Sequence, residues 1–121
     1  MQNLLKVSEN RQLSWRNLSI QNRISFLPQL AKLLLENKEA NATCITTEMH
    51  KPISQSIAEV EKCALLCNYY YENAETFLAT KTIKTNASES FVIYEPLGVI
   101  LGVMPWNFPF WQVFRFAVPT I

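Results

Sequence analysis

The sequence SQSIAEVEKCALLCNYYYENAETFL, residues 54–78, carries one continuous apolar stripe at the spacing of an α-helix. Successive members of the stripe are three or four residues apart over about six turns, which places them on one helix face. Ser56 to Glu59 also fits the capping box that begins many helices, so we expect the helix to start at 54–56. A stripe of this length has to pack against a large apolar surface. Its members are Ile57, Val60, Ala64, Cys67, Tyr71, Ala74 and Leu78.

The chain upstream of this stretch is predicted to form shorter helices, over residues 1–13, 19–37 and 38–48. Ser19 can cap the second helix, and Pro28 should bend it because proline removes one backbone hydrogen bond. The third helix should end before Pro52, since the residue that precedes a proline avoids helical angles. The second helix has apolar residues at helical spacing, namely Ile20, Ile24, Leu27, Ala31 and Leu34.

The periodicity changes after the long helix. Residues 81–85 alternate and residues 90–94 are β-branched and aromatic, so both are predicted strands of a hairpin with a turn at 86–88. Val99 to Met104 is a short apolar run, typical of a strand that is buried on both faces. Residues 110–118 could open a helix. This order predicts helices, then a hairpin, then a first buried strand with the beginning of its helix.

The composition is that of a globular protein, with 49% hydrophobic and 17% charged residues among 121. A net charge of +1 gives no reason to expect nucleic acid or an anionic membrane as a partner. Three cysteines and the lack of a secretory signal favour a reducing cytoplasm. From residue 97 to residue 121 the only charged side chain is Arg115. Because the chain stops inside its most apolar stretch, we expect it to be truncated.

Residues 105–109 (PWNFP) place Asn107 between two prolines, directly after the predicted buried strand. In parallel sheets, ligands bind at the carboxyl ends of the strands. An asparagine amide can donate a hydrogen bond to a developing oxyanion, which is a catalytic role. The alternative is a loop asparagine that caps the next helix. The spacing alone leaves both interpretations open.

Several segments resemble the aldehyde dehydrogenase superfamily. Residues 95–99 (EPLGV), followed by residues 105–109, are similar to a signature of that family. Residues 47–52 (TEMHKP) resemble its T-E-M-G-K-P segment, with His50 in place of the glycine. Residues 106–119 look most like bacterial succinate-semialdehyde dehydrogenases. The resemblance covers roughly residues 15–121.

The resemblance implies that the family's aldehyde substrate, here succinate semialdehyde, is oxidised to the acid with NAD or NADP. A cysteine thiolate attacks the aldehyde, hydride passes to the nicotinamide, and a glutamate activates water. Asn107 matches the asparagine that helps to form the oxyanion hole. Arg115 matches the arginine that pairs with the substrate carboxylate, which its guanidinium fork can bind with two hydrogen bonds. The residues that match the lining of the cofactor site are Val103, Met104, Pro105 and Trp106.

The resemblance also implies an α/β fold that is truncated in this chain. Residues 1–80 would form the N-terminal helical part of the cofactor-binding domain, residues 81–96 strands like the family's oligomerisation arm, and residues 97–121 the start of a Rossmann-like strand–helix unit. The family's nucleophilic cysteine and general-base glutamate come later and have no counterpart here. We therefore expect this chain to be inactive alone, and to self-associate or join a full-length homologue because large apolar patches would be exposed.

Local residues are not expected to replace the missing chemistry. Cys67 on the apolar stripe and Cys63 one turn before it are expected to be buried structural thiols. Together with His50 they lack a recognised metal-ligand spacing, so no metal site is expected.

Two other functions stay open: a non-enzymatic module that joins a full-length family member through the strand arm, and a membrane-associated protein in which residues 97–121 span a bilayer. Prolines, Asn107 and Arg115 disfavour such a span.

Overall fold

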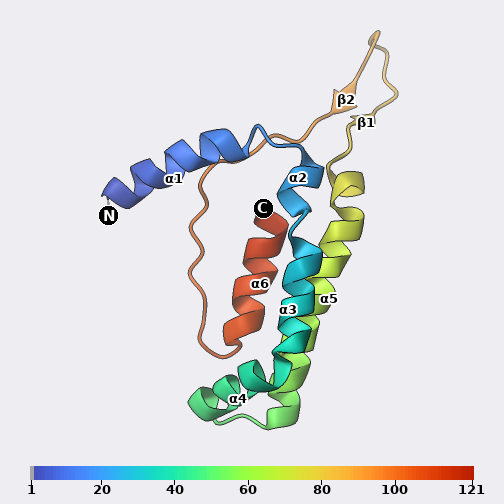
Figure 1. Ribbon diagram of the computed structural model, residues 1–121. Helices are drawn as coiled ribbons and strands as arrows, with labels where there is room; N and C mark the ends of the chain where they lie inside the picture. Colours follow the sequence, from blue (N-terminus) through green and yellow to red (C-terminus); the bar gives the residue numbers. More distant parts are fainter. Residues whose placement is uncertain (1) are drawn as a thin grey trace.

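The long helix α5 (Ile53–Leu78) is the axis of the fold, and other helices pack along it (Figure 1). The computed structural model describes residues 2–121. α3 (Leu27–Glu36) and α6 (Pro109–Thr120) run beside α5, and α4 (Lys38–Met49) crosses one end of it. The short helix α2 (Ile20–Ile24) also contacts α5, whereas α1 (Gln2–Trp15) points away from the other helices. The strands β1 (Lys81–Thr82) and β2 (Phe91–Val92) form a hairpin beyond the end of α5.

The core lies where α3, α4 and α6 meet α5, and it confirms most of the predicted stripe. Val60, Ala64, Cys67 and Ala74 are buried. The prediction is wrong for Tyr71 and Leu78, which are 44% and 42% exposed. The buried face of α5 also includes the row of side chains next to the predicted stripe on the helix surface. Three residues of that row are buried: Ser56, Glu59 and Cys63. Two of these three are polar, and each therefore needs a partner inside the protein.

The predicted capping box does not form. α5 begins earlier, at Ile53, and its N-cap residue is Pro52, with φ −54° and ψ 135° and no side-chain cap. The Ser56 hydroxyl lies one turn inside the helix and shares a hydrogen bond of 2.8 Å with the Thr46 hydroxyl on α4. The Glu59 carboxylate points to α6 rather than back to the start of its own helix.

The predicted helix over residues 19–37 is two helices, α2 and α3. Ser19 caps α2 as predicted, and its Oγ accepts a hydrogen bond of 3.2 Å from the Asn22 amide. Pro28 does not bend a continuous helix, because it lies in the first turn of α3, where its missing N–H would have no partner in any case. The helix predicted over 38–48 is confirmed as α4, and α1 extends the 1–13 candidate to Trp15.

The hairpin and the segment after it contain less strand than predicted. β1 and β2 are antiparallel, with Lys81 opposite Val92 and Thr82 opposite Phe91, so each predicted strand is paired over only two residues. The prediction of a buried strand at Val99 to Met104 is wrong within the described chain. The segment has no ladder partner in residues 2–121, and Leu101 and Val103 are each 87% exposed. Without neighbouring strands its backbone cannot form a sheet. The described fold is therefore mostly helical with one small sheet.

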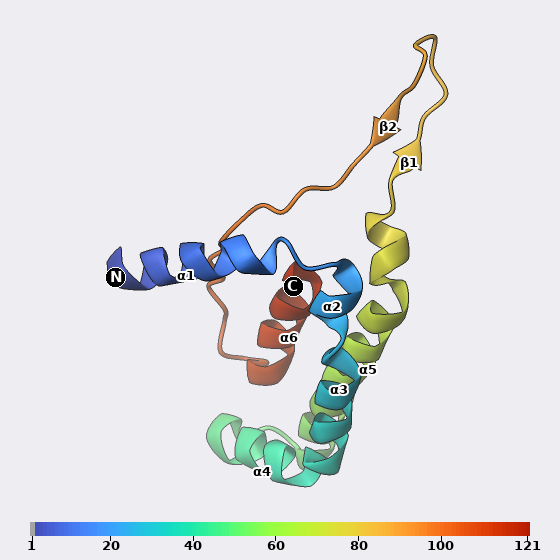
Figure 2. The same ribbon diagram turned by 45° about the horizontal axis from the view of Figure 1, so that its top comes forward.

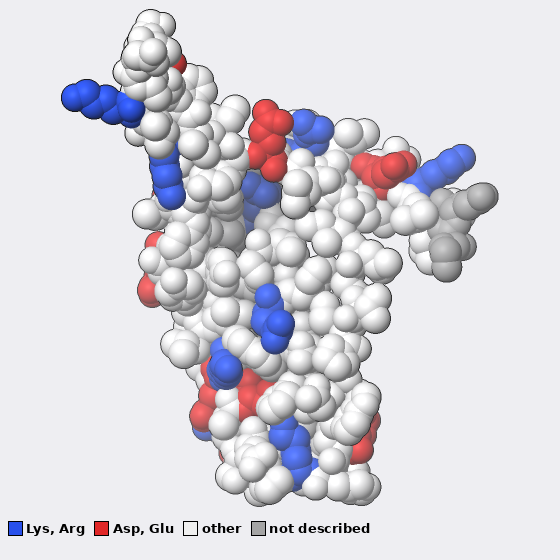
Figure 3. Space-filling model, turned by 180° about the vertical axis from the view of Figure 1, so that it is seen from behind, with Lys and Arg blue, Asp and Glu red and all other residues white. Residues whose placement is uncertain are grey.

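Charged side chains are not gathered by sign on the surface. On the face opposite to that of Figure 1, small groups of both signs are separated by wide uncharged areas (Figure 3). Several of the uncharged side chains that reach solvent are large, and Leu65 and Leu97 are 70% and 90% exposed. No helix in the part of the chain that the structure describes combines the length and apolarity that crossing a bilayer requires.

His50 ends α4 in a left-handed conformation, with φ 53° and ψ 30°, and its amide donates a hydrogen bond to the Thr46 carbonyl. Glycine is the residue that takes this conformation without a steric penalty, and it is the usual residue at such helix ends. We expect His50→Gly to raise the free energy of unfolding by roughly 0.5–1 kcal/mol in a urea titration. His50→Ala keeps a Cβ and should give no gain. Equal stabilities of the Gly and Ala variants would contradict this explanation.

Candidate active-site loop

The loop from Leu97 to Phe108 leads from the hairpin to α6 and runs along the outer side of that helix (Figure 2). Gly98 begins the loop with φ 94°, a conformation that residues with a Cβ rarely adopt. Gly102 lies so close to α6 that a Cβ placed on it would be 2.8 Å from the Phe116 ring and 2.7 Å from the Met104 Cε. The loop therefore approaches α6 closely at Gly102.

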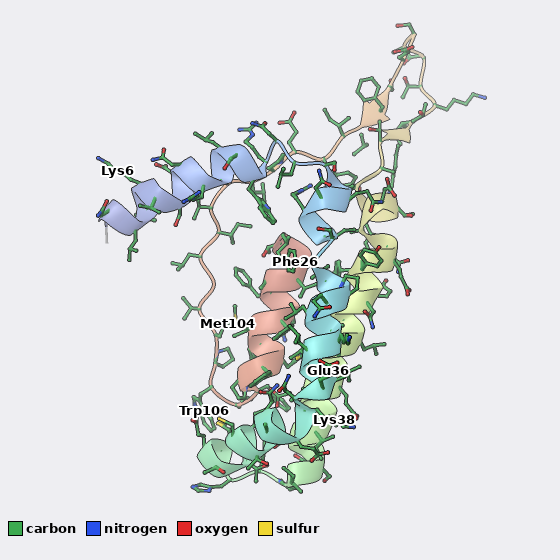
Figure 4. The ribbon with its side chains drawn as sticks, in the orientation of Figure 1. Lys6, Phe26, Glu36, Lys38, Met104 and Trp106 are labelled. Carbon is green, nitrogen blue, oxygen red and sulfur yellow. The ribbon has the colours of Figure 1, made fainter. Side chains whose placement is uncertain are left out.

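The predicted cofactor-lining residues lie together on this loop and mostly face solvent. Val103 is 87% exposed and Trp106 is 78% exposed, Pro105 is also exposed, and Met104 is half-buried. Met104 and Trp106 lie on the part of the loop that descends to the start of α6 (Figure 4). The loop thus presents an apolar surface to solvent directly before Asn107.

Asn107 is exposed, and its side chain forms no hydrogen bond with another residue in 2–121. The alternative interpretation, a helix cap, is wrong for this residue. The N-cap position of α6 is held by Phe108, and no side-chain cap is formed there. The amide is therefore free to donate a hydrogen bond to a bound group.

Arg115 lies on α6, in the second turn after Pro109, and it is exposed. It forms no salt bridge with any acidic side chain of the described residues. Arg115 lies on α6 and Asn107 lies on the loop that enters this helix. No hydrogen bond joins the two side chains within the described residues. A guanidinium with no acidic partner can bind a carboxylate from a ligand.

Glu59 holds the start of α6, and the sequence analysis missed this role. Glu59 as a whole residue is 4% exposed, and its Oε1 accepts hydrogen bonds of 3.0 Å from the amides of both Phe110 and Trp111. The first amides of a helix have no partner within the helix, and a negative charge there is favoured by the helix dipole. Oε2 forms a salt bridge with Lys51 Nζ, which lies 4.3 Å from the centre of the Phe108 ring. The signal in the sequence was an acidic residue next to Val60 on the apolar face.

The three cysteines are free, and two of them are buried as predicted. Burial raises the pKa of the Cys63 thiol to about 12, with a further contribution from the Glu59 charge, and burial raises the pKa of the Cys67 thiol to about 11. Both residues therefore stay protonated at neutral pH, and a thiol is a much weaker nucleophile than a thiolate. Cys44 is exposed on α4, where its Sγ donates a weak hydrogen bond to Glu48. Within residues 2–121 no three His, Cys, Asp or Glu side chains form a metal-binding group.

These thiol environments predict the reactivity of the native chain. At pH 8 an alkylating reagent should label Cys44 rapidly and leave Cys63 and Cys67 unlabelled. In roughly 8 M urea, a concentration at which the chain should be unfolded, all three cysteines should react. Peptide mapping of the labelled chain gives the measurement. Labelling of Cys63 or Cys67 at the rate of Cys44 in the native chain would contradict the burial of the α5 thiols.

A cavity of about 520 Å³ lies at the carboxyl end of α6, opposite the end that Asn107 precedes. It is lined by residues 118–121 and by parts of α1, α2, the end of α5 and the segment between Tyr94 and Ile100. Its apolar lining includes Trp15, Tyr70 and Phe77. None of the predicted site residues, from Val103 to Asn107 or Arg115, lines this cavity. The candidate site is therefore separate from this cavity, and most of its residues lie on an exposed loop surface.

Comparison with known proteins identifies the family. The sequence matches the aldehyde dehydrogenase family over residues 1–121. It is 52% identical over 108 residues to the "Probable succinate-semialdehyde dehydrogenase", NADP+, of Synechocystis, covering 89% of this chain and 24% of the relative. It is 40% identical over 121 residues to the succinate semialdehyde dehydrogenase, NAD(P)+, of Escherichia coli strain K12, covering 100% of this chain and 26% of the relative.

A solved structure shows the same arrangement. The succinic semialdehyde dehydrogenase of Streptococcus pyogenes, in complex with NADP+ as the cofactor, superposes with a TM-score of 0.92 and 29% sequence identity, over 98% of this chain and 26% of that chain. The chain belongs to the aldehyde dehydrogenase family, and succinate-semialdehyde dehydrogenases are among its most similar named relatives. It spans about a quarter of the length of these relatives. The resemblance stated from the sequence is confirmed.

Proposed function

We propose that this chain supplies the N-terminal part of an NAD(P)-dependent succinate-semialdehyde dehydrogenase, and that its 121 residues do not oxidise an aldehyde alone. In this proposal Asn107 donates a hydrogen bond to the oxyanion, and Arg115 binds the carboxylate of the substrate. The observation that carries it is the PWNFP loop, which presents an unpartnered Asn107 amide to solvent directly before a helix whose start is held by Glu59. The names of the most similar relatives support the choice of succinate semialdehyde.

The loop fits one part of a dinucleotide cofactor. Val103 and Trp106 are exposed apolar side chains, which suit contact with a flat ring. From residue 97 to residue 121 the only charged side chain is Arg115, and there is no glycine-rich turn that could hold phosphates. When bound, the nicotinamide of such a cofactor provides the acceptor for the hydride. In the proposal, Val103 and Trp106 would contact the nicotinamide ring of the cofactor, and residues outside 97–121 would bind its phosphates.

The role of Asn107 follows from the charge that develops during attack on an aldehyde. As a nucleophile adds to the carbonyl carbon, negative charge builds on the oxygen, and a fixed amide N–H stabilises that charge more than it stabilises the neutral aldehyde. The geometry of the described chain offers no nucleophile to match. Cys63 and Cys67 are buried thiols with raised pKa values, and Cys44 lies on the exposed side of α4. In this proposal the described residues supply the groups that stabilise the oxyanion, and the attacking thiolate comes from outside them.

The role of Arg115 can be tested in a chimera in which residues 1–121 replace the matching 26% of the Escherichia coli relative. We expect Arg115→Met to lower kcat/KM for succinate semialdehyde by about ten- to a hundred-fold, because a charged hydrogen-bonded pair is lost. The value for butanal, which has the same chain length and no carboxylate, should stay nearly unchanged. Equal losses for both aldehydes would contradict a role in binding the carboxylate.

A second candidate is a non-enzymatic module that joins a full-length family member through the hairpin. The hairpin projects from the helices (Figure 1), and its strands are paired over only two residues each. Phe91, Val92, Ile93 and Tyr94 are between 42% and 57% exposed, which leaves an apolar strand available for a partner. Co-purification of a tagged chain with a complete family member, lost on Ile93→Lys, would favour this candidate. Unchanged capture by the variant would exclude the hairpin as the contact.

A further inference from the structure

We infer that Glu59 is a positioning residue for the Asn107 amide, acting through the backbone at the start of α6. This inference deepens the proposed function and rests on it. Glu59 lies on α5, far from the PWNFP loop in sequence, and touches none of the groups that would meet the substrate. Its contacts nevertheless fall on the residues that follow Asn107 directly.

Glu59 and its partner Lys51 contact the chain at the end of the loop and in the first turn of α6. Oε1 accepts hydrogen bonds of 3.0 Å from the Phe110 and Trp111 amides, three and four residues after Asn107. Oε2 pairs with Lys51 Nζ, and the same ammonium lies 4.3 Å from the centre of the Phe108 ring, the residue next to Asn107. One carboxylate and its lysine thus contact the chain at three of the four residues from 108 to 111.

Burial makes this attachment stiff. The side chain of Glu59 is 2% exposed and that of Lys51 is 12% exposed, so water competes little for their charges. Hydrogen bonds to a buried ionised acceptor are stronger and more directional than those between neutral exposed groups. Pro105 and Pro109 restrict the backbone on either side of Asn107. The backbone at Asn107 is therefore held from both sides, by the prolines and by the Glu59 contact.

A purely structural role would make Glu59 a support for α6 and nothing more. A positioning role makes a further demand: removal of Glu59 should harm the reaction only through Asn107. A donor displaced by about an ångström loses much of its effect on an oxyanion, and such misplacement costs on the order of ten- to a hundred-fold in rate. Once the Asn107 amide is gone, the same displacement should cost nothing more.

The test is a double-mutant cycle in the chimera that carries residues 1–121, with kcat and KM measured for succinate semialdehyde. We expect Glu59→Ala to lower kcat by about ten- to a hundred-fold with little change in KM for the aldehyde. Glu59→Gln keeps the acceptor for the two amides and should recover part of the loss. Glu61→Ala, on an exposed turn of the same helix where Glu61 pairs with Lys38, is the matched control and should leave kcat unchanged.

The decisive result is the effect of Glu59→Ala in an Asn107→Ala background. No further loss of kcat in that background supports positioning, and the same loss in both backgrounds overturns it. If Asn107→Ala alone leaves kcat unchanged, the proposed function fails and the positioning role fails with it. These outcomes are distinct, because the first compares Glu59 variants and the second depends on Asn107 alone.

Amide hydrogen exchange in the 121-residue chain tests the same contact without catalysis. In Glu59→Ala the Phe110 and Trp111 amides should exchange at least about ten-fold faster than in Glu61→Ala, while amides of α3 keep their protection. Equal exchange of these two amides in both variants would overturn the inference, because Glu59 would then not hold the start of α6.

Discussion

Replacing Lys51 by methionine is expected to lower the free energy of unfolding of the chain by about 3 kcal/mol. Methionine keeps much of the volume of lysine and removes the charge. The Glu59 carboxylate, on a side chain that is 2% exposed, would then stay buried with two backbone amides and no cation. Because those two amides still compensate part of its charge, the loss should lie at the lower end of the range for broken buried ion pairs. Urea unfolding followed by circular dichroism gives the measurement.

Lys38 provides a control of the same chemistry at a different depth. It pairs with Glu61 at 2.8 Å, but the two side chains are 37% and 46% exposed, against 12% and 2% for the Lys51–Glu59 pair. Solvent screens such exposed pairs, so Lys38→Met should leave the stability nearly unchanged. A loss for Lys51→Met no larger than that for Lys38→Met would contradict the account of a buried charge that fastens α6 to α5.

The second large effect is expected for Asn107→Ala in the chimera, where kcat for succinate semialdehyde should fall by about a hundred- to a thousand-fold. The amide is exposed and forms no hydrogen bond within residues 2–121, so the variant should unfold at nearly the same urea concentration as the parent. Asn107→Asp is nearly the same size but replaces the N–H donor by a negative charge. It should therefore lose at least as much activity as Asn107→Ala.

Asn86, in the exposed turn of the hairpin, is the matched control for this experiment. Asn86→Ala removes the same side chain at a distance from the loop and should leave kcat within about two-fold of the parent. If Asn107→Ala behaved like Asn86→Ala, the amide could not be the oxyanion donor. A loss of stability in Asn107→Ala would instead point to a structural role for the residue.

The sequence could predict the helical part of the fold because local signals and burial agree there. Ser19 caps α2, α4 has the predicted bounds to within a residue, and the α5 stripe buries Val60, Ala64 and Cys67. Periodicity could not predict which side chains next to the α5 stripe would also be buried, since that depends on where α3 and α6 pack against the helix. Tyr71 and Leu78 were misplaced for this reason.

The errors at Glu59 and at Val99–Met104 have a different cause. Ser56 to Glu59 satisfies a local capping pattern, but Pro52 starts the helix one turn earlier and α6 offers the carboxylate two unpaired amides. A contact across about fifty residues leaves no local pattern in a single sequence. The apolar run at 99–104 has the composition of a buried strand, but a strand also needs neighbours, and residues 2–121 contain none for it.

The candidate site was predictable only through the family motif. The two prolines around Asn107 marked the loop, but that spacing left both a helix cap and an oxyanion donor open. The structure excludes the interpretation of Asn107 as a helix cap, because Phe108 is the N-cap residue of α6. The exposed positions of Val103, Trp106 and Arg115 are compatible with binding a ligand, and their roles stay predictions.

The formation of NAD(P)H from succinate semialdehyde, measured side by side for the chimera and for the 121-residue chain, tests the central claim most directly. The claim is that these residues work as the N-terminal quarter of a succinate-semialdehyde dehydrogenase and are inactive alone. It predicts turnover by the chimera within about ten-fold of the Escherichia coli parent and none by the chain. Turnover by the chain alone, or a folded chimera that is inactive with this aldehyde, would contradict it.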